Sequence, residues 1–165
     1  MPTLESFRTF VFRSASTVNP WKGSVSALDM PERFGREARM VSFLAHEHAF
    51  RLRRNCVDGD HLLLALLEND RALALLQNSG ANADVVRLPL ALRMVPELER
   101  TKRDAVLPKS SVLHKAWGDA HVIADRQGAR LIEPEHLLLA LVVPDKAGRL
   151  SNTARNLLAS GFGRP

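Results

Sequence analysis

The sequence predicts an all-α fold in which a four-helix motif occurs twice, related by a pseudo-twofold axis, with the second copy truncated. The main observation is a repeated heptapeptide. Residues 60–66 read Asp-His-Leu-Leu-Leu-Ala-Leu, and residues 135–141 read Glu-His-Leu-Leu-Leu-Ala-Leu, 75 positions later. We call these two segments the first and second boxes. A second observation is composition: Leu and Ala dominate, aromatic residues make up 5% of the chain, and Tyr is absent. Such a composition favours interlocking aliphatic helices.

The repeat extends well beyond the boxes. The same offset pairs Ala45 with Ala120, His46 with His121, Ala49 with Ala124, and Val57 with Ile132. After the second box the offset becomes 81, because residues 75–80 align with residues 156–161. Six residues are therefore inserted in the second copy, and we expect them in a loop within residues 144–151.

The first copy is expected over residues 31–95. Apolar residues at helical spacing predict a long first helix over residues 31–55. Asp58 is expected to cap a second helix that runs to residue 68, and a third helix over residues 71–78 is expected to end at Gly80. A fourth helix begins near Asn82, and we expect Pro89 to break it near residue 88, since an interior proline costs roughly 3 kcal/mol.

The second copy is expected over residues 110–161, after a charged linker over residues 96–109. Ser110 or Ser111 is expected to cap its first helix, which Gly128 ends. Glu133 then precedes Pro134 at the favoured first position of the next helix. A last helix is expected from residue 152 or 153 to residue 160, with no fourth helix after it.

Residues 1–30 allow three interpretations. The segment has few acids and many hydroxyl residues, which is typical of an organellar targeting segment. Alternatively, Phe7, Phe10 and Phe12 belong to an arm that packs on a neighbouring chain or on the second copy, which lacks a fourth helix. The segment could also be an upstream extension, with Met30 as the true start. We favour the arm.

The sequence lacks the motifs of several kinds of enzyme and metal site. There is no Gly-Lys dipeptide, hence no P-loop, and no Gly-x-Ser-x-Gly elbow. His46, Glu47 and His48 lack the spacing that places two imidazoles on one helical face, which argues against zinc. The single Cys56 is interpreted as a packed small residue. We expect no enzymatic activity, no cofactor and no membrane helix.

The net charge of +5 leaves one alternative open. A basic helical chain can bind nucleic acid, but the Lys and Arg residues are scattered through the predicted helices, with no run longer than two. A solvated basic surface is therefore the preferred interpretation, and nucleic-acid binding is the alternative function.

The doubled pattern resembles the N-terminal domain of the ClpA- and ClpC-type unfoldases, a double Clp-repeat domain. The resemblance covers residues 32–161 and rests on Arg33-Phe34 with Ala38 and Arg39, on the two boxes, and on the Ser-Gly pairs at residues 79–80 and 160–161. It implies a protein-binding module that docks substrates or adaptors for a Clp ATP-dependent protease, or regulates it. The implied partners are Clp ATPase or protease subunits, adaptors and substrates. The single cysteine, which rules out an internal disulfide, fits a reducing, cytoplasmic setting. A targeting segment would instead place the chain in an organellar stroma or matrix.

The box acids have a structural and a functional explanation. As first-turn residues, Asp60 and Glu135 would be stabilised by the helix N-terminus by ~0.3 to 1 kcal/mol. The resemblance implies instead that they form two pockets for arginine-bearing ligands, including phosphoarginine. His61 and His136 are expected to hydrogen-bond locally.

The resemblance also implies companion residues around each pocket. In the family, a Gly-Thr pair precedes the acid. Here that pair is replaced by Asp58-Gly59 in the first copy and by Glu133-Pro134 in the second. The companion hydroxyl is kept as Ser110 but replaced by Gly35 in the first copy. On this alignment Ser110 is assigned to the second pocket, which then retains more of the family pattern than the first.

Overall fold

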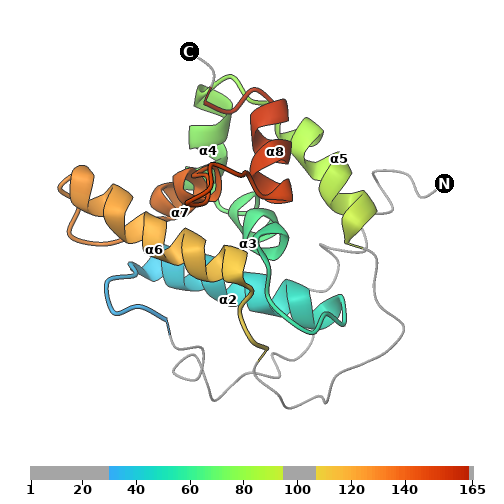
Figure 1. Ribbon diagram of the computed structural model, residues 1–165, viewed down its shortest axis with the longest axis horizontal. Helices are drawn as coiled ribbons and strands as arrows, with labels where there is room; N and C mark the ends of the chain where they lie inside the picture. Colours follow the sequence, from blue (N-terminus) through green and yellow to red (C-terminus); the bar gives the residue numbers. More distant parts are fainter. Residues whose placement is uncertain (1–29, 95–106, 164–165) are drawn as a thin grey trace.

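The computed structural model describes residues 30–94 and 107–163 (Figure 1). Its helices are α2 (Arg36–Arg51), α3 (Gly59–Leu66), α4 (Asp70–Asn78), α5 (Ala83–Arg93), α6 (Ser111–Arg126), α7 (Pro134–Leu141) and α8 (Asn152–Ala159). The described residues contain no strand beyond isolated bridges, so the predicted all-α class is confirmed. The arm expected before Met30 and the linker residues 96–106 lie outside the described residues.

The two copies are joined by two short backbone bridges that obey the repeat. Phe34 pairs with Ile132, and Val57 pairs with Lys109, both in parallel. Adding 75 to the number of Phe34 gives Lys109, and subtracting 75 from that of Ile132 gives Val57, as expected for pseudo-twofold symmetry. Each bridge thereby holds the segment just before the long helix of one copy beside the segment just before the box of the other copy.

The boxes form the centre of the fold. Figure 1 shows α3 and α7 in the middle, with α2 and α6 on one side and α4, α5 and α8 on the other. Five leucines of the boxes have at most 1% of their surface exposed: Leu62, Leu63, Leu66, Leu137 and Leu138. Burying a leucine completely contributes about 1.5 to 3 kcal/mol, so the repeated apolar run acts mainly as core.

The first helix is shorter than predicted. α2 starts at Arg36 rather than near residue 31, because the preceding backbone pairs with Ile132: the Gly35 N–H donates to Ile132 O at 2.9 Å. At the other end, Arg53 has a positive φ of 56°, which stops the helix before Asn55. Both ends are thus set by contacts and backbone conformation that periodicity does not report.

The expected break near residue 88 is wrong, since α5 continues through Pro89 to Arg93. Val86 and Leu90 are both fully buried and hold the helix against the core on either side of the proline. The buried Asn156 side chain of α8 donates to Val86 O at 2.9 Å, three residues before the proline. Tertiary packing and this hydrogen bond offset the intrinsic preference of proline to end a helix.

The second copy follows the prediction over its described residues. Ser110 caps α6, Glu133 precedes α7 with Pro134 in its first turn, and Ser151 caps α8. After α8 the described residues, which reach 163, contain no further helix. None of the helices in the described parts of the chain is both long and apolar enough to cross a membrane.

Candidate functional site

Each box places its acid at the beginning of a central helix. Asp58 caps α3 by accepting the Gly59 N–H at 2.7 Å, as predicted. The histidine that follows each acid completes the turn: His61 Nδ1 accepts the Asp58 N–H at 3.0 Å, and His136 Nδ1 accepts the Glu133 N–H at 2.9 Å. This is the reciprocal half of a capping box, with histidine in the place usually taken by Glu or Gln. The predicted local hydrogen bonding of both histidines is confirmed.

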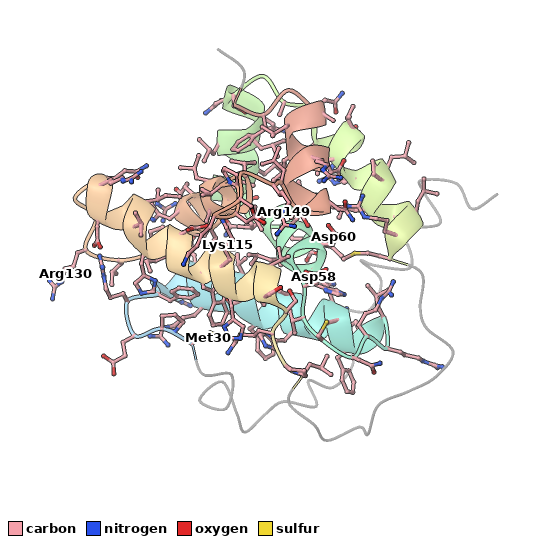
Figure 2. The ribbon with its side chains drawn as sticks, in the orientation of Figure 1. Met30, Asp58, Asp60, Lys115, Arg130 and Arg149 are labelled. Atoms are coloured by element: carbon pink, nitrogen blue, oxygen red, sulfur yellow. The ribbon has the colours of Figure 1, made fainter. Side chains whose placement is uncertain are left out.

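The first acid site consists of Asp58 and Asp60 (Figure 2). Arg93, at the end of α5, approaches Asp60 with both arms of its guanidinium: Nε lies 2.8 Å from Oδ2 and Nη2 lies 3.0 Å from Oδ1. Thr153 of α8 also donates to Asp60 Oδ1 at 2.7 Å. Both carboxylate oxygens of Asp60 are therefore bonded within the chain.

Ser110 belongs to this first acid site. Its hydroxyl donates to Asp58 Oδ1 at 2.8 Å, and its oxygen also accepts the Leu113 N–H at 3.2 Å. The assignment of Ser110 to the second pocket is therefore wrong. In the folded chain, the start of each long helix lies beside the box of the other copy. An alignment of the two copies does not reveal this arrangement.

The second acid site consists of Glu133 and Glu135. Arg71 of α4 contacts both: its Nε lies 2.8 Å from Glu135 Oε1, and its Nη1 lies 3.2 Å from Glu133 Oε2. The other oxygen of Glu135, Oε2, is buried and has no hydrogen-bond partner among the described residues. This site therefore keeps an acceptor that the first site has already used.

Gly35 leaves space for the Glu133 side chain at the second acid site. A Cβ atom at residue 35 would lie 2.6 Å from Glu133 Oε1, too close for any side chain unless Glu133 moved. Gly35 is the repeat equivalent of Ser110, and Glu133 is the equivalent of Asp58. The longer acid thus occupies the space that the serine side chain takes at the first acid site.

The histidines differ in what lies behind them. His136 Nε2 lies 3.0 Å from Gln127 Oε1, whereas His61 Nε2 is buried without a partner among the described residues. Desolvation by burial lowers the pKa of His61 to about 4, and the Asp58 charge only partly opposes it. His61 therefore stays neutral near pH 7 and supports Asp58 structurally, with its ring 5% exposed.

A small cavity adjoins the first acid site. It has a volume of about 250 Å³, and its walls include Cys56, Asp58, Asp60 and Arg93. This volume suits a single side chain better than a drug-sized ligand, for which pockets start at roughly 300 Å³. The half-buried Cys56 forms part of its wall.

Both acid sites have the chemistry to bind a guanidinium. A carboxylate facing an arginine forms charge-assisted hydrogen bonds with a defined planar geometry. Over residues 30–94 and 107–163, no group of three or more His, Cys, Asp or Glu side chains is arranged to hold a metal ion. Each site is a pair of carboxylates with an arginine of the same chain beside it, Arg93 at the first and Arg71 at the second.

Sequence reasoning brought out the acids but missed their partners. Arg71, Arg93 and Thr153 come from α4, α5 and α8, between 33 and 93 positions away from the acids that they contact. No repeated pattern marks these residues, because the copies differ at them. A sequence signal for them was absent, and the helix packing alone brings them to the boxes.

The comparisons with known proteins agree with this architecture. The family model described as the Clp repeat (R) N-terminal domain matches residues 33–156, most of the chain. The chain therefore belongs to the Clp repeat N-terminal domain family. It is also 32% identical, over 121 residues, to a chaperone protein ClpB 1 of Parasynechococcus marenigrum (strain WH8102); the match covers 72% of this chain but 14% of that protein.

Two solved structures share the fold. One is the N-terminal domain of the caseinolytic protease associated chaperone ClpD from Arabidopsis thaliana, with a TM-score of 0.54 and 20% identity, covering 78% of this chain and 86% of that one. The other comes from structural work on a malarial protein secretion system, with a TM-score of 0.65 and 14% identity, covering 77% and 83%. At these identities the likeness concerns the fold.

Proposed function

We propose that this chain is a non-enzymatic protein-binding module that docks substrates or adaptors for a Clp ATP-dependent protease, or regulates that protease. Membership of the Clp repeat N-terminal domain family supports a role within a Clp system. The partners would be Clp ATPase or protease subunits, adaptors, or substrate proteins, and the setting would be cytoplasmic. Any ATP hydrolysis would belong to another polypeptide or domain.

The observation that carries the proposal is that each acid site already holds an arginine of the same chain. Arg93 binds Asp60 through two nitrogens, and Arg71 bridges Glu133 and Glu135. These contacts support the proposal, because a guanidinium of the chain itself fits beside the carboxylates. An arginine-bearing segment of a partner, with or without a phosphoarginine mark, could take the place of either internal arginine.

Of the two sites, the second acid site is the better binding site for such a ligand. Glu135 Oε2 is an unused buried acceptor, and the Arg71 side chain is 47% exposed, so it can swing into solvent. At the first acid site, Asp60 is 16% exposed and all its contacts are already made. We expect arginine ligands to engage Glu135 more strongly than Asp60.

Calorimetric titration with an arginine peptide and a phosphoarginine peptide tests this ligand class. Removing the charge without changing shape, by Glu135→Gln, should weaken binding by about 1.5 to 3 kcal/mol, and Asp60→Asn should weaken it less. Asp84→Asn, which neutralises a 75% exposed acid that belongs to neither site, is the matched control. Failure of the wild type to bind either peptide would refute the pocket function but leave docking by other surfaces.

Recovery of partners from the native cell extract tests the wider role. The tagged chain, with the Glu135→Gln variant in parallel, is used to isolate partners that are identified by mass spectrometry. Clp subunits or their adaptors should be recovered by the wild type. Recovery of ribosomal or nucleoid proteins alone would contradict the proposal and favour the nucleic-acid alternative.

A further inference from the structure

A second surface feature adjoins the start of α6. It is a groove of about 480 Å³ between the first turns of α6, the end of α7, the loop over residues 142–151 and the start of α8. Its floor is apolar and includes Val112, Ala116, Leu141 and Val143, while its rim carries Lys115, Arg149 and Arg155. We call it the basic groove.

The basic rim exists only in the second copy. At the repeat-equivalent positions the first copy has Met40 in place of Lys115 and Ala74 in place of Arg155. Arg149 lies in the six-residue insertion, which has no counterpart in the first copy. The insertion therefore adds one wall of the groove and one of its three cations at once.

The acids beside the groove do not neutralise its rim. Lys115 pairs with Asp119 and also donates to Val143 O at 2.8 Å. Arg149 pairs with Asp145 at 2.9 Å, yet its side chain remains 79% exposed. The exposed Arg155 forms no ion pair with any described residue, so the three cations outnumber the two acids.

The two helices that open onto the groove differ from the other described helices in their first turns. α6 and α8 both begin there, and neither has an acid in its first turn. The other helices of the described chain, including α3 and α7, each have one. Asp58 and Asp60 nevertheless lie against these two helix starts, since Ser110 at the start of α6 donates to Asp58 and Thr153 of α8 donates to Asp60. The cations of the rim therefore account for the basic charge of the groove.

From this combination we propose that the basic groove binds an extended segment of a partner protein in which apolar residues alternate with Asp or Glu. The apolar side chains would cover the floor, and the carboxylates would pair with Lys115, Arg149 and Arg155. This goes beyond the acid sites, which have the opposite charge and bind guanidinium groups. One partner chain could engage both surfaces, since Ser110 beside the groove also bonds Asp58.

Charge selects this occupant over the other candidates. Residues 1–29 contain two acids against three Lys or Arg residues, so that segment does not complement a basic rim. A second copy of the chain carries a net charge of +5, which opposes self-association through this surface. Nucleic acid is disfavoured because the lining has an apolar floor and an acid, Asp145, but no aromatic side chain on which bases could stack.

Fluorescence anisotropy with a labelled peptide of alternating leucine and glutamate tests the proposal on the full chain. The double variant Arg149→Glu/Arg155→Glu should weaken binding by roughly tenfold or more, because two charge-assisted contacts become repulsive. The matched control Arg126→Glu/Arg130→Glu makes the same change in net charge at the far end of α6, where Figure 2 labels Arg130, and should leave binding near the wild-type level.

Two further measurements keep the result independent of folding defects in the variants. Wild-type affinity should fall as salt is raised, and a peptide with lysine in place of glutamate should bind at least about tenfold more weakly. Equal binding of both peptides, or equal loss in both double variants, would overturn the proposal. So would binding of a single-stranded oligonucleotide, but not of the acidic peptide, through the same arginines.

Discussion

The two acid sites began as equivalent parts of a repeat and reach the same chemistry with different residues. Asp60 is held by Arg93 from α5, whereas Glu135 is held by Arg71 from α4. The second copy has no described equivalent of α5, so a residue from the neighbouring copy supplies the guanidinium there. The repeat thus preserves the acid and its helix start, while the partner changes with what the surrounding helices provide.

The residues before each acid show the same compensation in volume. Asp58 with Ser110 at the first acid site corresponds to Glu133 with Gly35 at the second. A short acid beside a hydroxyl side chain is exchanged for a long acid beside a glycine. The space is filled in both cases, but only the first site gains a hydroxyl hydrogen bond, and only the second keeps a free carboxylate oxygen at Glu135.

The largest expected effect tests whether the two boxes are equivalent as core. Leu62 and Leu137 are repeat partners, and both are completely buried. Leu62→Ala and Leu137→Ala should each lower the free energy of unfolding by about 2 to 5 kcal/mol, by loss of apolar contact and creation of a cavity. Denaturant unfolding measures this, with Leu92→Ala on the 72% exposed side chain of α5 as the control. A loss in one box only would show that one copy dominates the core.

The second-largest expected effect is a pH dependence of stability that comes from His61 of the first box. The pKa of His61 is about 4 in the folded chain and near 6.5 when unfolded, so the unfolded state binds more protons between these values. Stability should therefore fall as the pH drops from 6.5 towards 4, by roughly 3 kcal/mol in total.

The variant His61→Gln should flatten this profile, because Gln can accept the Asp58 N–H but does not titrate. Unfolding curves between pH 4 and 7 provide the measurement. A residual slope is expected from His46, whose pKa is also lowered by burial. An unchanged slope in the variant would mean that His61 is not the group that protonates on unfolding.

A smaller effect, on affinity, concerns the internal arginines. Arg93→Ala should raise the affinity of the first acid site for an arginine peptide by up to roughly tenfold, since a competing self-pair worth about 1.4 kcal/mol has that consequence. Arg71→Ala should raise the affinity of the second site less, because Glu135 Oε2 is already available. Titration calorimetry measures both, with Asp60→Asn and Glu135→Gln backgrounds to isolate one site at a time. A larger gain from Arg71→Ala would reverse the order of the two sites.

The smallest expected effect concerns the exchange of side-chain volume between Gly35 and Glu133. Gly35→Ser should push the flexible end of Glu133 aside and break its contact with Arg71, lowering stability by less than about 1 kcal/mol. Adding Glu133→Asp should restore the loss, because the pair then matches Ser110 with Asp58. Thermal unfolding of the single and double variants compares them. A double variant less stable than Gly35→Ser alone would show that the two sites are not interchangeable.

The sequence by itself determined much of this protein. The repeated boxes, the caps at Asp58 and Ser110, and the proline before the second box fixed the helix order, the all-α class and the family, since local capping and apolar periodicity act within one turn or one helix. The same signals identified Asp60 and Glu135 as residues at helix starts. Each of these inferences depends on neighbours in the chain.

What only the tertiary structure decided are the contacts between helices far apart in the sequence, most of them between the two copies. Ser110 reaches Asp58 across the pseudo-twofold axis, Arg71 and Arg93 reach acids of distant helices, and Asn156 supports the proline-containing α5. These pairings depend on how helices pack, and packing is set by the summed burial of many side chains rather than by any spacing along the chain. For that reason the repeat could locate the acids, but only the folded chain could show that their guanidinium partners were already in place.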